Sequence, residues 1–279
     1  MSKATLSFLV LTFTALVTAC SGFVKNEYRS GTSSSLVDFL YPGNEVPTIE
    51  QDQTPHLKLP LRVGLAFVPA KYSNRDTLPE NKKTQLLEQV KSEFSHLPYV
   101  NEITVIPEAY MRSRKGFDGL EQLSRLYSLD VIALVSFDQV AISSGRKSAL
   151  LYWTIVGSYV VKGSQNSVNT FVDTAVIDMK TRKLLLRAPG VSELAKNSTL
   201  VELDKVSREI KEEGFEMAMV DMSQNLTQEL QAFEERIKQD KSVEVSYRKG
   251  HGGGGSVSLM TLLALALLLA LCRRSANLP

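Results

Sequence analysis

The sequence predicts an α/β fold, with a single mixed sheet packed with helices. Between residues 61 and 142, β-rich runs alternate with amphipathic runs in the order strand, helix, strand, helix, strand. From 150 to 187 the pattern changes to successive β-rich runs joined by short turns, as in antiparallel hairpins. From 199 to 239 apolar residues recur at helical spacings. We therefore expect a βαβαβ unit, then antiparallel hairpin strands, then a long C-terminal helical region.

The first half supplies three strands and two helices. The first strand ends at Pro69, and the first helix stops near Pro98, since proline cannot continue either element. The run Val131–Val135 is continuously apolar, which is typical of a strand buried on both faces. In order, the expected elements are a strand at 61–68, a helix at 81–97, a strand within 100–111, a helix at 119–128 and a strand at 130–142.

The second half is expected to form hairpins followed by helix. Strands are predicted at 150–162, 170–179 and 183–187, with a turn at 163–166 between the first two. In the last region, one apolar stripe is followed by another whose phase slips near Gly214. The slip predicts two helices or one kinked helix.

The first twenty residues have the architecture of a bacterial secretory signal. Lys3 precedes an apolar stretch, which ends in Val17-Thr18-Ala19-Cys20. This ending is similar to the lipobox of bacterial lipoproteins. The resemblance implies cleavage between Ala19 and Cys20 by signal peptidase II, acylation of Cys20 with palmitate-type chains, and, with Ser21 next, sorting to the outer membrane. The alternative is an ordinary signal peptide that happens to end in cysteine.

The last thirty residues form a second signal. Gly252, Gly253, Gly254, Gly255 and Ser256 precede the apolar run Val257–Cys272, and Arg273 and Arg274 close it. As a helix this run would extend about 24 Å, against a hydrocarbon core of roughly 30 Å, so it is a marginal membrane span. The two arginines would stay on the cytoplasmic side, which places the rest of the chain across the membrane. The alternative is a buried core helix after a glycine linker.

This tail resembles the GlyGly-CTERM signal recognised by rhombosortases, which are rhomboid intramembrane proteases. Glycines beside a membrane segment disfavour helix and let the backbone unwind into a protease site, so 252–256 is the expected processing region. A lipobox and such a tail on one chain together resemble the rhombotarget lipoproteins. A second anchor beside the lipid would be redundant, so we expect the tail to span the inner membrane transiently and then be removed. A permanently bitopic protein stays the alternative.

These signals divide the chain into five parts. We expect a signal peptide at 1–19, a lipidated flexible tether at 20–59, an α/β envelope domain at 60–242, a linker and glycine hinge at 243–256, and the membrane tail at 257–279. Within the tether, Leu36–Tyr41 is an apolar island, interpreted as a segment that packs on the domain or as a partner-docking motif. The chain has two cysteines, Cys20 at the lipobox and Cys272 in the tail, so we expect no disulfide in the mature body.

No motif in the body points to catalysis. The formal charge of +2 favours no polyanion, so no nucleic-acid partner is expected. His56, His96 and His251 lack metal-ligand spacing, and no metal or other cofactor is expected. Ser143, Ser144, Asp173 and Asp178 are the nearest candidates for catalytic side chains, and turn formation or hydration explains them better.

The middle of the chain resembles, at the level of pattern, the domains of curli-secretion-type and penicillin-binding-protein-activator-type lipoproteins. The residues that carry this resemblance are Tyr127–Val135 and Asp173–Leu184. The resemblance implies a sheet that binds protein partners. We therefore expect an exported, non-catalytic lipoprotein that binds another envelope protein, on the periplasmic or the surface face. A hydrolase with an unrecognised site is the alternative function.

Overall fold

The computed structural model describes residues 27–43, 53–71, 77–145, 164–199, 201–240 and 242–248. It confirms an α/β fold in which a mixed sheet is packed with helices, one of them long. The main sheet has six strands: β1 (Glu27–Ser34), β3 (Leu61–Phe67), β4 (Val100–Val105), β5 (Val131–Gly145), β6 (Ser164–Asp178) and β7 (Leu184–Ser198). Two short strands, β2 (His56–Leu59) and β8 (Glu244–Tyr247), pair separately.

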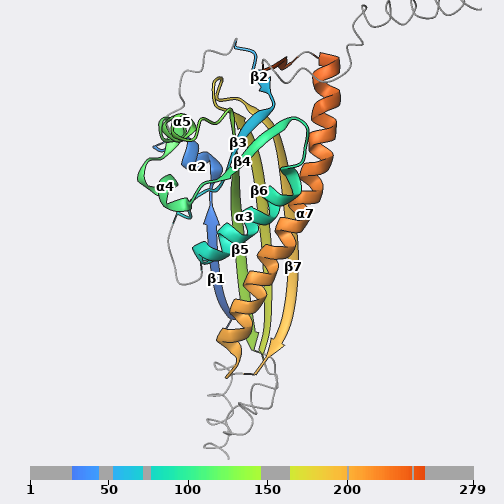
Figure 1. The fold of residues 1–279 in the computed structure, drawn as a ribbon. Coiled ribbons are helices and arrows are strands. Elements are labelled where there is room, and N and C mark those ends of the chain that lie inside the picture. Colours follow the sequence, from blue (N-terminus) through green and yellow to red (C-terminus); the bar gives the residue numbers. More distant parts are fainter. Residues whose placement is uncertain are drawn as a thin grey trace, which may run out of the picture.

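The sheet is parallel on one side and antiparallel on the other, as expected. Its order is β4-β3-β5-β6-β7, with parallel pairs between β3 and its two neighbours and antiparallel pairs from β5 onward. Strand β5 is long enough to hold two partners along one edge. Its residues 131–135 pair with β3, and residues 137–144 pair with β1. The sheet is therefore elongated along β5, β6 and β7 (Figure 1).

Helices cover both faces of the sheet (Figure 1). On one face lie α3 (Glu80–Phe94) and α7 (Leu203–Asp240), which share an apolar cluster with β3, β5 and β6. On the other face, α2 (Leu36–Leu40), α4 (Glu108–Ser113) and α5 (Gly116–Leu126) share a second cluster with the same strands. Residues Val131–Val135 are buried, because helices cover both faces there.

The last helical region is one continuous helix, which corrects the alternative of two separate helices. Residues 203–240 form α7 without a break. Gly214 marks a close approach instead of a break, since a Cβ built there would lie 2.8 Å from the Thr170 hydroxyl on β6. The second part of the apolar stripe packs on a different part of the core, where Phe233 and Ile237 contact a separate cluster that includes Val131 and Leu185.

The folded domain is larger than the sequence predicted. The segment 20–59, expected to be a flexible tether, contains β1, α2 and β2, and the segment 243–256, expected to be a linker, contains β8. The polar strand β1 was missed because its stability comes from pairing with β5 and not from apolar alternation. The Leu36–Tyr41 island packs on the domain, with Phe39 and Leu40 buried against α5.

Local boundaries differ at three further places. Residues 108–111, expected to end a strand, belong to α4 (Glu108–Ser113), because Pro107 precedes the first turn of a helix there. Residues 164–166, expected in a turn, belong to β6, and β7 extends to Ser198, beyond the predicted end at 187. The predicted strand at 150–162, the signal peptide at 1–19 and the tail at 257–279 lie outside the described residues. In the part of the chain that is described, no helix is both long and apolar enough to cross a membrane.

Candidate apolar binding site

A cavity of about 330 Å³ lies between the sheet and the helices α3 and α7. Its floor is the face of β3, β5 and β6 at the end of the sheet where β5 begins, and β2 and β8 line it as well. The lining is almost entirely aliphatic and aromatic. It comprises Leu57, Leu59, Leu61, Val63, Val90, Phe94, Leu97, Tyr99, Val100, Ile103, Val131, Ala133, Val176, Leu185, Leu186, Leu226, Leu230, Phe233, Glu234, Ile237, Lys238, Val245 and Tyr247.

The size and the lining of this cavity are those of a ligand site. Small-molecule sites are concave, mostly apolar, and at least roughly 300 Å³ in volume. An engineered apolar cavity of about 150 Å³ holds one benzene molecule. By that measure the present cavity accommodates roughly a dozen carbon atoms. Unfilled apolar space of this size lowers stability, since its lining loses dispersion contacts, so an occupant would recover that loss.

Few polar side chains line the cavity, and three of them, Glu234, Lys238 and Tyr247, are exposed to solvent. Glu234 and Lys238 lie four residues apart on α7, and Tyr99 precedes β4. Desolvation by burial raises the pKa of the Tyr99 phenol above its ordinary value, and the nearby Glu234 carboxylate raises it further. Within the described residues Lys238 makes no ion pair, so its ammonium group is available to a ligand's anionic end. The site is therefore amphipathic, with a mostly apolar lining and exposed charged residues at its mouth.

Titration of Tyr99 tests whether its phenol is desolvated beside the Glu234 carboxylate. We expect the phenol to ionise above its ordinary pKa, and Glu234→Gln to reverse only the smaller part of the shift, because desolvation is the larger cause. Since the folded state holds the proton more tightly, the stability that this group contributes is lost as the pH rises through the folded-state pKa. Ultraviolet difference titration of the wild type against Tyr99→Phe isolates this phenol. An ordinary or lowered pKa would contradict the description.

The β2–β8 pair is held beside the cavity by a charged cluster around Asp130. The Asp130 carboxylate accepts a hydrogen bond from the Arg62 backbone N–H at 2.9 Å and from the Arg248 guanidinium at 2.6 Å. Arg248 also donates its backbone N–H to the Leu59 carbonyl at 2.9 Å. Asp130 thus joins three segments distant in sequence, and fixes where the chain leaves β8.

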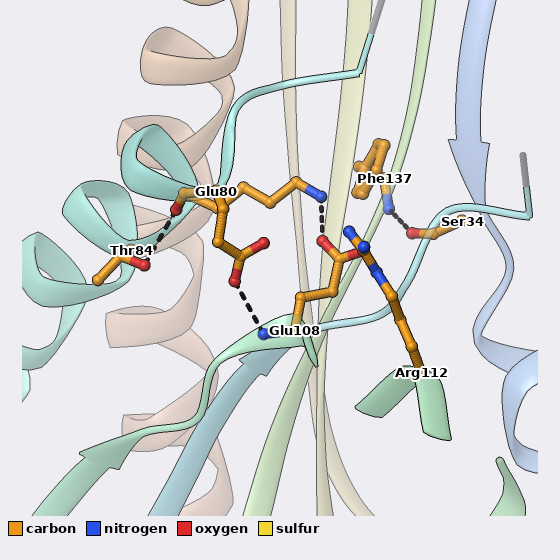
Figure 2. A network of polar contacts seen from close by, with 7 residues as sticks. Ser34, Glu80, Thr84, Glu108, Arg112 and Phe137 are labelled. Atoms are coloured by element: carbon orange, nitrogen blue, oxygen red, sulfur yellow. Dashed lines mark hydrogen bonds and ion pairs between the residues drawn. The ribbon is translucent and has the colours of Figure 1, made fainter. Parts of the chain in front are cut away.

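A second buried polar group lies on the same face of the sheet, at the start of α3. The Lys83 ammonium donates to Glu108, and the side chains of both are 3% exposed. Figure 2 shows that Glu108 also meets Arg112, while its backbone N–H points to Glu80, at 2.9 Å. The ammonium lies 5.3 Å from the centre of the Phe137 ring, as a cation–π contact. Because the side chains of Lys83 and Glu108 are both buried, we interpret this network as stabilising the fold and not as a binding site.

The structure does not assemble the sequence-predicted candidates into one site. The acylation site Cys20, the residues Ala19 and 252–256, and Arg273 and Arg274 lie outside the described residues. Asp173 is engaged by Arg187 at 2.7 Å, while Asp178 holds the turn at Thr181. His56 contacts Glu244 and Ser246 across the β2–β8 pair. Among the described residues, no group of acidic, histidine or cysteine side chains could hold a metal ion.

Sequence reasoning missed the cavity, although its members were visible as apolar stripes. Val90 and Phe94 on one helix, and Leu226 and Phe233 on another, read as core positions. What the stripes could not show is that the two helices leave a space between them at one end. One signal was available in the sequence. The charged residues Glu234 and Lys238 directly follow Phe233 and Ile237 of the apolar stripe, so charge and apolar surface meet at this end of the helix.

No family model matches the chain, and no curated protein matches it. Among solved structures, a putative neuraminyllactose-binding hemagglutinin homologue from Helicobacter pylori is 10% identical, with a TM-score of 0.38, covering 70% of this chain and 96% of its own. A DUF330 protein from Xanthomonas campestris is 8% identical, with a TM-score of 0.29, covering 68% and 95%. Lipoprotein GNA1162 from Neisseria meningitidis is 14% identical, with a TM-score of 0.24, covering 53% and 97%. These neighbours are bacterial proteins and include a lipoprotein, but likeness this low transfers no function, location or partner to this chain.

Proposed function

We propose that this protein is an exported bacterial lipoprotein whose domain is a non-catalytic binding module for a single aliphatic chain. The observation that carries the proposal is the cavity of about 330 Å³ between α3, α7 and the sheet, with its apolar lining and its charged mouth. Each methylene that moves from water into such a site contributes about 0.8 kcal/mol, so a chain that fills it gains considerable free energy. A carboxylate or phosphate at the mouth would lie within reach of Lys238.

The ends of the chain support the envelope location in this proposal. The lipobox at Cys20 would attach the mature protein to the outer membrane after signal peptidase II acts, and a rhombosortase would cleave within residues 252–256. The envelope protein expected as a partner would then be one that presents an acyl chain to the cavity. A phospholipid also carries an acyl chain. The proposal therefore specifies the acyl chain as the bound group, and an experiment distinguishes an acylated protein from a free lipid as its source.

Ligand binding is tested with the fluorescent fatty acid cis-parinaric acid, on the domain secreted without residues 249–279. All four apolar clusters lie within the remaining chain. We expect the fluorescence to rise on binding, and dodecanoic acid to displace the probe. Val176→Trp should lower the affinity about tenfold or more, because the indole fills space on the cavity floor. The matched change Val191→Trp, at a site 60% exposed on β7, should leave the affinity unchanged.

Two outcomes would contradict the binding proposal. One is an absence of probe binding to the folded domain, and the other is an equal affinity in Val176→Trp and Val191→Trp. Native mass spectrometry of the domain purified from its host then identifies the source of the chain. A bound lipid mass indicates a phospholipid or fatty acid, whereas co-purification of an acylated protein that Val176→Trp abolishes indicates a lipoprotein partner.

Processing at both ends is tested by the intact mass of the protein isolated from its host envelope. We expect a mass that starts at an acylated Cys20 and ends within residues 252–256. In a host without rhomboid proteases, the mass should increase by the missing C-terminal segment, while the acylation stays. A mature protein that keeps residues 257–279 in the normal host would contradict removal and favour the bitopic alternative.

A further inference from the structure

The strand β2 separates the apolar cavity from a second cavity of opposite character. Because side chains alternate along a strand, Leu57 and Leu59 line the apolar cavity, whereas His56 and Lys58 line the second one. Leu57 borders both. The second cavity has a volume of about 600 Å³ and lies between β2, α5 and the turn that joins β6 to β7. It therefore lies at the end of the sheet where β2 and α5 are found (Figure 1).

Positive charge predominates in this second cavity. Its lining includes five lysine and arginine side chains and three carboxylates, which leaves an excess of two positive charges. The basic residues come from β2, the start of β3, α5 and the turn after β6. They are Lys58, Arg62, Arg125, Lys180 and Arg182. A cavity lined in this way attracts anions, because charges of one sign around a cleft focus its electric field.

All three carboxylates of the lining are already engaged by donors of the protein. Glu121 accepts hydrogen bonds from Arg125 at 2.6 Å and from Arg182 at 3.4 Å. Asp130 holds the two arginine residues described above. Asp178 accepts two bonds, at 2.9 and 2.6 Å, from the N–H and the hydroxyl of one turn residue. The lysines of the lining therefore have no partner among these carboxylates.

Two lysines of the lining are available to a ligand. Within the described residues, neither Lys58 nor Lys180 makes a hydrogen bond or an ion pair, and both residues are exposed. The guanidinium of Arg182 lies 5.5 Å from the centre of the Phe117 ring, a cation–π contact that orients it. Its bond to Glu121 is long, at 3.4 Å, so most of its N–H groups remain for another acceptor.

Hydroxyl groups at the end of α5 add neutral donors. Ser124 and Ser128 line the cavity, and in the part of the chain that is described neither hydroxyl makes a hydrogen bond. The last carbonyls of a helix carry a partial negative charge, which disfavours an anion nearby. Here the backbone N–H groups of Leu129 and Ser128 already bond to the carbonyls of Ser124 and Arg125, at 2.7 and 3.3 Å. The helix end is thus capped, and its side chains offer donors.

A phosphate monoester matches these donors in charge and in geometry. It carries about two negative charges near neutral pH, which balances the excess of the lining. A guanidinium offers phosphate a fork of N–H donors, and lysine ammonium groups add point charges. A single carboxylate group would leave part of the excess unbalanced. The volume also lies in the range of small-molecule sites, roughly 300–1,000 Å³.

We propose that this second cavity binds a phosphate monoester, held by Lys58, Lys180 and Arg182. The inference goes beyond the proposed function and does not rest on it, because both the ligand chemistry and the donors differ from those of the apolar cavity. Two sources share this chemistry: a soluble phosphate ester, and the headgroup of a single-chain phospholipid. Leu57 borders both cavities, so a lipid bound in the apolar cavity would have the phosphate site beside it.

Isothermal titration calorimetry with glycerol 3-phosphate tests the proposal on the domain without residues 249–279, which keeps every described residue. We expect saturable binding. Lys58→Ala and Lys180→Ala should each weaken it about tenfold or more, since each removes a charge-assisted hydrogen bond. Lys180→Arg keeps the charge and should retain most of the affinity. Lys238→Ala removes the same charge beside the apolar cavity and is the matched control, with unchanged affinity.

Three results would overturn the phosphate site. The first is an absence of saturable binding, both for glycerol 3-phosphate and for its dodecanoyl ester. The second is an equal loss of affinity in Lys58→Ala, Lys180→Ala and Lys238→Ala, which would indicate attraction by overall charge alone. The third is equally tight binding of succinate, because this dicarboxylate has the same charge without a phosphate group.

The dodecanoyl ester of glycerol 3-phosphate identifies the source of the phosphate. If the ligand is a lipid headgroup, the ester should bind at least about tenfold more tightly than glycerol 3-phosphate, and Val176→Trp should remove that gain. If the ligand is a soluble ester, the two compounds should bind alike and Val176→Trp should have no effect. In both cases Lys58→Ala must weaken binding, and an ester that binds independently of Lys58 and Lys180 would overturn the site.

The proposed function and this inference fail in distinguishable ways. If the domain binds cis-parinaric acid but shows no lysine-dependent binding of either phosphate compound, the inference is overturned and the binding of an aliphatic chain stands. If glycerol 3-phosphate binds through Lys58 and Lys180 while cis-parinaric acid does not bind, the phosphate site stands and the proposed function is overturned.

Discussion

Replacing Glu108 by Gln is expected to lower the free energy of unfolding by about 3–5 kcal/mol. The change leaves the Lys83 ammonium without its carboxylate at a site where both side chains are 3% exposed. Water cannot compensate the lost charge there, and the rings of Phe67 and Phe137 near the ammonium give only a weaker cation–π attraction. Arg112 also loses its ionic partner, since its guanidinium donates to the other Glu108 oxygen at 2.8 Å.

Urea denaturation of the shortened domain measures this effect, and two controls define its cause. Glu88→Gln removes an exposed pair with Lys91 and should change the stability by at most about 1 kcal/mol. The double variant Lys83→Met with Glu108→Leu should recover most of the loss, because replacing both members of a buried pair by apolar groups is often neutral. If Glu108→Gln lowers the free energy of unfolding no more than Glu88→Gln does, burial adds nothing to the contribution of the Lys83–Glu108 pair.

The elements that sequence reasoning found are those with strong local patterns. The buried run Val131–Val135 and the stripe Leu86, Leu87, Val90 and Phe94 predicted β5 and α3, because periodicity reports directly which face is apolar. The long helical region was recognised for the same reason. Its continuity was not, because the apolar phase shifts near Gly214 where the helix closely approaches Thr170, without any break in the helix.

The elements that it missed depend on partners far along the chain. Strand β1 carries almost no apolar side chains, and Ser34 is placed by accepting a hydrogen bond from the Phe137 backbone N–H at 2.9 Å. Strands β2 and β8 pair although His56 and Glu244 are separated by most of the sequence. No local signal specifies such pairings, since short polar strands have little intrinsic preference of their own.

The buried ion pair and the candidate site follow the same rule. Lys83 stands three and four residues before Leu86 and Leu87, so a cation on the apolar face of a helix was visible in the sequence. Its partner was not, because Glu108 comes from another helix. The cavity is less predictable still: a space is defined by what its walls leave open, and the walls come from α3, α7, β2, β8 and the sheet.

Replacing Gly190 by Ala is expected to lower the free energy of unfolding by about 2–3 kcal/mol, toward the upper end of the usual cost of overpacking. A Cβ at this position of β7 would lie 2.2 Å from the Ala218 carbonyl oxygen and 2.5 Å from the Met222 backbone nitrogen. Both atoms belong to the backbone of α7, so no side chain can move aside and the helix itself must shift. The neighbouring bonds resist that shift, because Asp221 accepts the Val191 N–H at 2.9 Å and Asn225 donates to the Pro189 carbonyl at 2.8 Å.

Gly31→Ala is the matched control, because a Cβ on this β1 glycine meets its nearest atom only at 3.4 Å. Its effect should stay within about 0.5 kcal/mol, since it removes a flexible residue from a strand without a clash. The two variants also differ in what they do to the cavity. A displaced α7 carries Leu226 and Phe233 with it, so Gly190→Ala should change the affinity for cis-parinaric acid and Gly31→Ala should not. Equal stability in both variants would mean that α7 is not held against β7 at Gly190, and unchanged probe affinity in a destabilised Gly190→Ala would mean that the helix yields locally without moving the cavity wall.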